Sequence, residues 1–446
     1  MIRTKFFITL LFSLISFCSF AQEIDEDYDY AQESTLEYKN KIYNDQIHTL
    51  NFHKRGNSSG LPVINLNGGE RLLLTFDDFS MKVEDLNYRI VHCDYDWKPT
   101  DLQYFQYISG NEEPFIYDLT FSTAFNQSYI QYSLSIPNDD VKFKASGNYL
   151  VYVYRNGDPS KLLLSHQFYV TEDRVQLKAY VHPAFSPSYR NKKHEIDFSI
   201  DHSKYPIINP SDAVKVTLLQ NNRTDNAITD LKPLFVSNNT LEYNHNGPNT
   251  FWAGNEQRFA DLRNLSQKTE GINGFVNRTD SVHVFLEPMK TRRMHRQGNL
   301  LGSIYGGRVI GSTAFNHTGA SDIDYCIVYF YLEQEIEDPN GSYYVFGELS
   351  NNTLDDKFKM EYDSERKRYR LATYLKQGYY NWLVMYSKDG ITGDVQRIEG
   401  SFIEAENSYS ILVYHKDITA DYTRLIKHST LFYPSKQSQF RFDLKK

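Results

Sequence analysis

The stretch Ile130-Gln131-Tyr132-Ser133-Leu134-Ser135-Ile136 decides the fold class. Large apolar side chains occupy every second position and polar ones lie between them, which is typical of a β-strand with one buried face. The same alternation occurs at 86–90 and at 175–181, and turn sequences such as Asn156-Gly157-Asp158 separate these runs. We therefore predict an all-β protein made of serial immunoglobulin-like β-sandwich domains with few short helices.

The composition supports this interpretation. The chain has 446 residues, of which 40% are hydrophobic and 15% aromatic, so it can bury several cores and is not disordered in bulk. It contains 35 Tyr and 29 Phe against three Trp, and Tyr and Phe favour strands. The net charge is −8 without a prominent Lys/Arg block, which argues against a nucleic-acid binder.

Changes of pattern along the chain predict six segments. The acidic run 23–30 opens a segment without a clean period, and the polar residues after Val170 mark a boundary between strand sets. The predicted ranges are a signal peptide at 1–21, an N-terminal segment at 22–45, a first sandwich at 46–170, a second sandwich at 171–290, a connecting loop region at 291–322 and a third sandwich at 323–446.

The N-terminus indicates export. Basic residues Arg3 and Lys5 precede an apolar run at 6–20, and Ala21 follows it, which is the layout of a Sec signal peptide. A membrane anchor is the alternative, but a span needs about 20 apolar residues and this run is shorter. Cleavage after Ala21 would change the net charge from −8 to −10. Since no later segment is long enough to span a bilayer, we expect a protein partner to provide any membrane association.

Two cysteines follow the predicted cleavage site, Cys93 and Cys326. Each lies in a strand-like apolar run, where a free buried Cys is an ordinary core residue. An oxidising compartment also permits a disulfide between them, but we favour two free cysteines.

The residues between the second and third predicted sandwiches carry a candidate contact region. We expect one helix just before it, at 255–268, because Phe259, Leu262 and Leu265 are three residues apart. The segment 288–320 then lacks a strand pattern up to Val309, and long irregular connections are often functional. Its basic cluster comprises Lys290, Arg292, Arg293, His295 and Arg296. Such clusters are commonly only solvated, but we predict partner contact by Arg292, Arg293 and Arg296.

Chemistry-bearing motifs are sparse. The carboxylate pairs Asp77-Asp78 and Asp355-Asp356 lie at strand ends, where acids often serve turns, although glycosidase pairs leave no linear spacing. The cluster His92-Cys93-Asp94-Tyr95-Asp96 could suggest metal, but alternation along a strand sends neighbouring side chains to opposite faces. We assign no catalytic, cofactor-binding or metal-binding residues.

Four stretches make the chain resemble the plug protein family of the type IX secretion system of Bacteroidetes. Their order and spacing cover nearly the whole mature length. The stretches are Leu72-Leu73-Leu74-Thr75-Phe76-Asp77-Asp78-Phe79 with Tyr88 to Trp97; Tyr129 to Tyr149; Leu219-Gln220-Asn221-Asn222-Arg223 with Gly254-Asn255-Glu256; and Tyr344-Val345-Phe346-Gly347 with Gly378-Tyr379-Tyr380 and Tyr422-Thr423-Arg424-Leu425-Ile426.

This resemblance implies a function as well as a family. It implies a periplasmic, non-enzymatic subunit without cofactors that binds the periplasmic mouth of the outer-membrane β-barrel translocon. The subunit would close that mouth when no substrate passes. A channel wide enough for folded cargo would leak unless something rigid closed it, and stacked sandwiches supply rigidity.

A second resemblance concerns the third sandwich alone. Tyr343 to Gly347, Tyr369 and Gly378-Tyr379-Tyr380 are similar to glycogen-binding, immunoglobulin-like domains. Those modules stack sugar on an exposed Trp, and Asn351-Asn352-Thr353 occupies the corresponding place here. The alternative function is therefore a periplasmic carbohydrate-binding β-sandwich protein.

Overall fold

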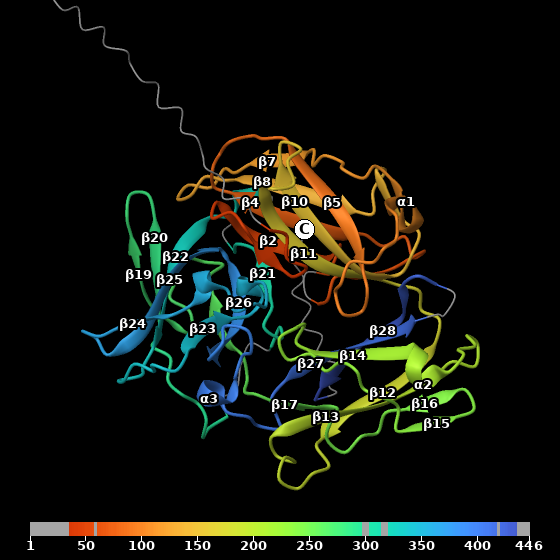
Figure 1. Ribbon diagram of the computed structural model, residues 1–446. Helices are drawn as coiled ribbons and strands as arrows, with labels where there is room; N and C mark the ends of the chain where they lie inside the picture. Colours follow the sequence, from red (N-terminus) through yellow and green to blue (C-terminus); the bar gives the residue numbers. More distant parts are fainter. Residues whose placement is uncertain (1–34, 58–59, 297–302, 314–319, 417–419, 435–446) are drawn as a thin grey trace, which may run out of the picture.

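A computed structural model describes residues 35–57, 60–296, 303–313, 320–416 and 420–434. The chain forms three β-sandwich units, each with its own large buried cluster of apolar side chains (Figure 1). The all-β prediction is confirmed. The predicted signal peptide and residues 22–34 lie outside the described residues.

The first unit packs two main sheets around a core that runs from Ile47 to Val170. One sheet has the order β1-β11-β10-β5 with β3 parallel to β11, the other has the order β2-β4-β8-β7, and β6 pairs with β9. The elements are β1 (Lys41–Ile42), β2 (Ile47–Lys54), β3 (Val63–Asn65), β4 (Leu72–Asp78), β5 (Leu86–Cys93), α1 (Tyr104–Tyr107), β6 (Ile108–Gly110), β7 (Asp118–Phe121), β8 (Ile130–Ile136), β9 (Val141–Phe143), β10 (Gly147–Arg155) and β11 (Leu162–Thr171).

The second unit is closed by strands from two distant parts of the chain. Its sheets have the orders β12-β13-β16-β15, with β17 beside β13, and β14-β27-β28. The elements are β12 (Gln176–Pro183), β13 (Lys193–Asp201), α2 (Pro210–Ala213), β14 (Val214–Gln220), β15 (Phe235–Ser237), β16 (Thr240–Glu242), β17 (Thr250–Trp252), β27 (Asn407–Lys416) and β28 (Thr423–Tyr433).

The third unit lies between these two parts of the sequence. Its sheets have the orders β19-β20-β22-β25-β24 and β18-β26-β21, with β23 also paired to β26. The elements are β18 (Arg258–Asp261), β19 (Ile272–Asn277), β20 (Val282–Leu286), β21 (Arg308–Ile310), η1 (Ala320–Asp322), β22 (Tyr325–Leu332), β23 (Ser342–Phe346), η2 (Glu348–Ser350), η3 (Asp356–Phe358), β24 (Glu361–Asp363), β25 (Arg368–Lys376), β26 (Gly378–Ser387) and α3 (Gln396–Glu399).

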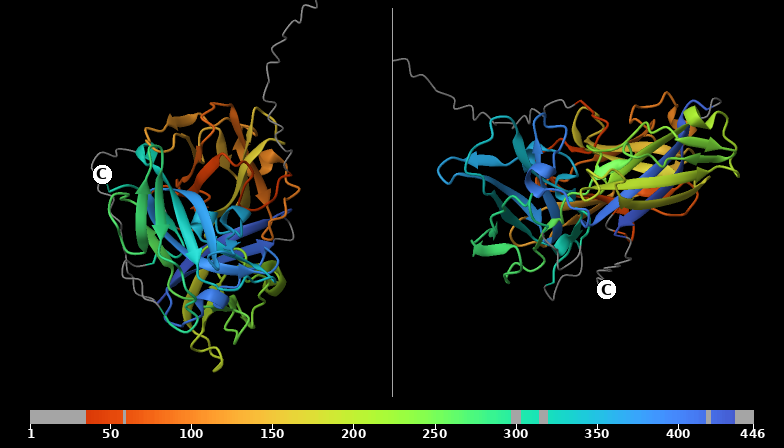
Figure 2. Two further views of the ribbon diagram at one scale, coloured as in Figure 1. Left: turned by 90° about the vertical axis from the view of Figure 1, so that its left-hand side faces the viewer. Right: turned by 90° about the horizontal axis from the view of Figure 1, so that it is seen from below.

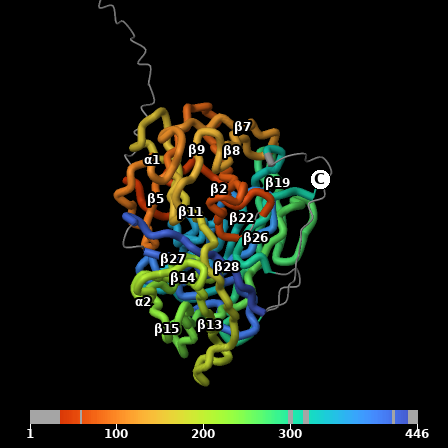
Figure 3. Tube along the Cα trace, turned by 90° about the vertical axis from the view of Figure 1, so that its right-hand side faces the viewer, coloured from red at the N-terminus to blue at the C-terminus, as the bar shows by residue number. Residues whose placement is uncertain are grey.

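The last two described strands differ from the sequence-based range for the third sandwich. β27 pairs with β14 over seven consecutive register positions, from Val214↔His415 to Gln220↔Tyr409. Figure 3 shows β27 and β28 beside β14, and their buried side chains, such as Ile411 and Val413, belong to the second core. Residues 407–433 therefore complete the second unit, because β14 needs a partner strand that the preceding chain does not supply.

The helix expected at 255–268 is wrong. The segment contains β18, which pairs with β26 from Arg258↔Trp382 to Asp261↔Tyr379. Ala260 and Leu262, two residues apart, are buried in the third core, so the period of two governs this segment. Pairing with β26 therefore decides the conformation of this segment, although the three-residue spacing of its apolar residues favours a helix.

The first and third units meet at a buried ion pair. Lys376 Nζ lies 2.7 Å from Asp77 Oδ2, and both side chains are only 1% exposed. The Tyr325 hydroxyl donates to the same carboxylate oxygen at 2.6 Å, and Gln131 donates to the other oxygen at 3.1 Å. The ammonium group also lies 4.1 Å from the ring centroid of Tyr129. Burial lowers the pKa of Lys376, and Asp77 opposes that shift.

The other pairs of units are also joined. Tyr414 donates from the second unit to Asn148 of the first at 2.8 Å, within a small apolar cluster that both units share. Between the second and third units, the guanidinium of Arg223 lies 5.1 Å from the ring centroid of Phe346. The two views in Figure 2 show the three units packed around one another. Each unit thus contacts both others.

Both described cysteines are free and buried, which confirms the favoured interpretation. Cys93 ends β5 in the first unit, and Cys326 lies in β22 of the third unit. Among the residues that the structure describes, no helix has the length and apolar character needed to cross a bilayer.

The junction of the first and third units should depend on the pairing of its charges. Replacing Lys376 with Met leaves the Asp77 carboxylate buried and unpaired, so the free energy of unfolding should fall by about 3–5 kcal/mol. The double variant Asp77→Asn/Lys376→Met should recover much of this loss, because Asn keeps an acceptor for Tyr325. Urea denaturation of both variants measures this. A loss in Lys376→Met below about 1 kcal/mol would contradict the assigned role.

Stability should fall in mild acid because of buried histidines such as His194. Its ring accepts from the Tyr409 hydroxyl at 2.7 Å and donates to the Ile403 carbonyl at 2.7 Å, and burial lowers its pKa from 6.5 to about 4. Between these values the unfolded chain binds a proton that the folded chain excludes, so stability is present above pH 6.5 and declines toward pH 4. In His194→Gln, the free energy of unfolding should vary less steeply with pH, by about 1.4 kcal/mol per pH unit. Urea denaturation at several pH values measures this dependence. If the free energy of unfolding of His194→Gln varied with pH as steeply as that of the wild type, the assigned role of His194 would be contradicted.

Candidate docking surfaces

The basic cluster at 290–296 lies partly inside the protein. Arg292 is buried, and its guanidinium contacts the Glu399 carboxylate at 2.6 Å and the Glu256 carbonyl at 2.8 Å. Arg258 contacts the same Glu399 carboxylate at 2.9 Å from the other side. Burial acts to raise the pKa of Glu399, but Arg258 and Arg292 outweigh it and the pKa is lowered. Arg292 thus links the segment just before β18 to α3.

The other two predicted contact residues are more accessible. Arg293 is exposed, and Arg296 is 44% exposed while its guanidinium pairs with the buried Glu256 carboxylate at 2.7 Å. The three arginines are therefore brought to one edge of the third unit, but only two reach solvent. Partner contact by Arg292, Arg293 and Arg296 stays a prediction.

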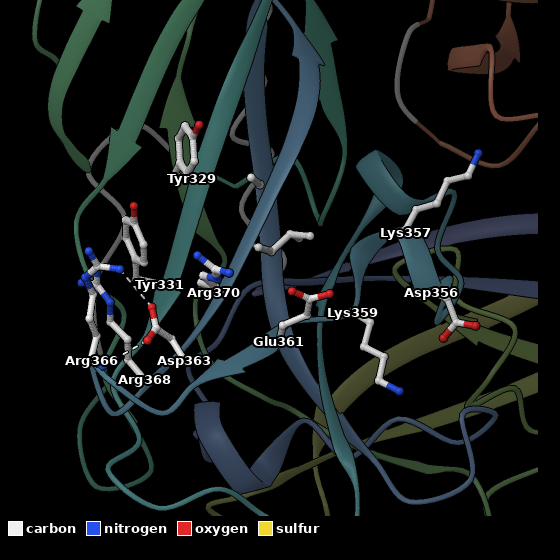
Figure 4. A pocket seen from close by; sticks show the side chains of 12 residues that line it. Tyr329, Tyr331, Asp356, Lys357, Lys359, Glu361, Asp363, Arg366, Arg368 and Arg370 are labelled. Atoms are coloured by element: carbon white, nitrogen blue, oxygen red, sulfur yellow. Dashed lines mark hydrogen bonds and ion pairs between the residues drawn. The ribbon is translucent and has the colours of Figure 1, made fainter.

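The third unit carries a hollow of ≈ 690 Å³ on the outer face of its β22-β25-β24 sheet (Figure 4). Its twelve lining residues include five cations and three acids. These are Lys357, Lys359, Arg366, Arg368 and Arg370, with Asp356, Glu361 and Asp363. Such a mixture does not define a site for a single anion or cation.

The two tyrosines in this hollow already contact neighbouring side chains. The guanidinium of Arg368 lies 4.0 Å from the ring centroid of Tyr331, and Phe285 stacks on Tyr329 with the centroids 4.7 Å apart. One face of each ring is thus already occupied by a neighbouring side chain, which leaves only the other face for sugar stacking. These side chains give no specific support to the carbohydrate-binding alternative.

Three of the four carboxylates in the two sequence pairs serve the fold, and the fourth, Asp356, lines the hollow. Asp77 is used in the buried junction, and the Asp78 carboxylate lies 3.7 Å from Arg155. Asp355 caps η3 by accepting from the Lys357 backbone N–H at 2.9 Å. Within the described ranges, no group of three or more His, Cys, Asp or Glu side chains is arranged to hold a metal ion.

One motif was missed by the sequence reasoning. Gly56-Asn57-Ser58-Ser59-Gly60 matches the Gly-x-Ser-x-Gly pattern of serine hydrolases. That chemistry requires a turn from a strand into a helix, whereas this segment lies between β2 and β3. Ser58 and Ser59 are outside the described residues. The surrounding topology therefore does not fit a hydrolase site.

The sequence reasoning also missed a group of exposed apolar side chains on the first unit. They lie in the β4–β5 connection, in the segment before β7 and around β7 itself, where charged or small residues are the usual surface choice. We call this group the aromatic end, and it consists of Met81, Val83, Phe115, Tyr117, Phe121 and Phe125.

Comparisons with known proteins identify the family. A family model described as the type 9 secretion system plug protein first domain matches residues 47–172, which span the first unit from β2 to β11. A crystal structure of a hypothetical protein from Parabacteroides merdae ATCC 43184 is similar over 89% of this chain and 100% of its own, with 32% identity and a TM-score of 0.85. A search of curated proteins finds no match. The chain therefore belongs to the plug protein family of the type IX secretion system.

Proposed function

We propose that this protein is the periplasmic subunit that closes the outer-membrane translocon of type IX secretion when no substrate is passing. Family membership gives the chain a role related to type IX secretion. The match of the family model to the first unit is the observation that carries the finer proposal.

The mechanical properties of the chain support such a role. A stopper must resist deformation, and here each of the three units contacts the other two through buried polar or aromatic groups. Because β27 and β28 complete the second unit after the third has been traversed, both chain connections of the third unit lead to the second unit. Relative movement of the units would break buried contacts rather than stretch a linker.

The proposal assigns a binding and blocking role, not catalysis. Of the carboxylates considered for hydrolysis, Asp77 serves the junction and Asp355 caps a short helix. We infer that the protein is exported to the periplasm by the N-terminal segment 1–21 and attaches to the outer membrane through the translocon.

Deletion of the gene in the source bacterium tests the blocking role. The outer membrane should then admit large antibiotics such as vancomycin that the intact membrane excludes, because an unblocked protein-wide channel remains open. Sensitivity to vancomycin and release of periplasmic protein into the medium measure this. Supplying the wild-type gene should restore the barrier.

Affinity purification from solubilised outer membranes tests the partner. The tagged full-length protein should recover the translocon, identified by mass spectrometry as a very large outer-membrane β-barrel. An intact permeability barrier in the deletion strain, or purification without any such barrel, would contradict the proposed function.

A further inference from the structure

We propose that the aromatic end of the first unit is the surface that docks on the translocon, and that it fits an apolar protein surface rimmed by basic side chains. This inference rests on the proposed function. The proposed docking surface consists of the six residues of the aromatic end and does not include the basic cluster at 290–296.

The exposure of these side chains is the first observation. Phe125 is 83% exposed and Tyr117 is 75% exposed, and the other four members are also open to solvent. Single exposed apolar residues are ordinary, but a group of them on one part of a folded protein marks an interaction site. Aromatic residues are enriched at such sites because they bring a large contact area with few rotatable bonds.

The topology places the six residues around β7 and the neighbouring strand ends of the first sandwich. The register Asp78↔Ile130↔Phe121 places the end of β4, the start of β8 and the end of β7 side by side. The loop that carries Met81 and Val83 leaves from the end of β4 and enters β5 at Leu86. Phe115 forms a bridge with Asn87 near the start of β5, and its ring lies 6.1 Å from that of Tyr117. In Figure 1, β7 and β8 lie at the top of the first unit, away from the second unit.

The loop that carries Phe125 is held in place by the third unit. The Asp324 carboxylate accepts the backbone N–H groups of Phe125 at 3.1 Å and of Asn126 at 3.0 Å, and the Asn126 side-chain amide donates to it at 2.9 Å. These bonds fix the backbone, yet the Phe125 ring points into solvent. A fixed, exposed aromatic ring loses little conformational entropy when a partner covers it, which favours binding.

The charges around the aromatic end indicate the chemistry of the partner. The segments 79–85 and 111–125 contain five acids, Glu84, Asp85, Glu112, Glu113 and Asp118, and one cation, Lys82. Arg155 pairs with Glu84, and Arg89 pairs with Glu112 and Glu113, so these five acids meet three cations and the border stays net acidic. An apolar area with an acidic border is complementary to an apolar area with a basic border. β7 also pairs only with β8 among the described strands, so its outer edge is open to contact.

Other exposed apolar residues offer a matched control. In the second unit, Phe185 is 72% exposed in the β12–β13 connection, and Ile208 is 77% exposed beyond the opposite end of β13. They are as accessible as Tyr117 and Phe125 but lie apart from one another. A general effect of removing surface apolar groups should therefore be the same for both pairs.

The experiment compares three tagged full-length proteins in a strain that lacks the native copy. They are the wild type, Tyr117→Ser/Phe125→Ser and Phe185→Ser/Ile208→Ser, with thermal melting used to verify that each is folded. The translocon recovered per tagged protein should fall at least about tenfold for the first pair, because central aromatic residues dominate interface energies. Recovery with the second pair should equal that of the wild type.

The outcomes separate this inference from the proposed function. If the wild type recovers no translocon, the proposed function fails, and this inference fails with it. If the wild type recovers the translocon and Tyr117→Ser/Phe125→Ser recovers as much, the function stands and the aromatic end is excluded. Equal losses with both pairs would also overturn the inference, because the effect would not be specific to this surface.

Discussion

The buried ion pair between Asp77 and Lys376 constrains the whole arrangement. Two charges removed from water are tolerated only while they remain in contact and their other hydrogen-bonding positions are satisfied. Here Tyr325 and Gln131 donate hydrogen bonds to the Asp77 carboxylate, and the ring of Tyr129 lies against the Lys376 ammonium group. Any other orientation of the first unit relative to the third would leave a charge buried and unpaired. The pair therefore selects one arrangement of the units, whatever it adds to the net stability.

This constraint acts together with the path of the chain. The third unit is inserted between β14 and its partner β27, so the second core cannot close until the third has been traversed. Glu399, just before β27, is held by Arg258 and Arg292, which fixes the point where the chain returns. The ion pair fixes the first unit on the third, and the returning strands fix the second. The result is a single body rather than three domains on linkers, which suits the proposed role of closing a channel.

Strands could be predicted from the sequence, but the pairing of strands far apart in the chain could not. Strand alternation such as 130–136 depends only on neighbours, so the all-β class could be predicted. The partnership of β14 with β27 joins residues about 200 apart, and no local period encodes it. For the same reason Asp77 resembled a turn residue and Arg292 a solvated loop residue, since the groups that bury them, Lys376 and Glu399, lie far along the chain. The helix expected at 255–268 failed because a three-residue spacing cannot reveal that β26 is available as a partner.

The exposure of the aromatic end, like the burial of Asp77 and Arg292, depends on distant parts of the chain. A local pattern does not tell a buried Phe from an exposed one, and only the folded chain shows that Phe121 and Phe125 are 51% and 83% exposed. Asp324 of the third unit accepts a hydrogen bond from the Phe125 backbone N–H, while the Phe125 ring stays exposed to water. The contacts between the first and third units thus also fix the loop that carries Phe125. In the proposed docking, rigidity and binding are therefore coupled, because the contacts that join the units also lower the entropic cost of ordering this loop when a partner binds.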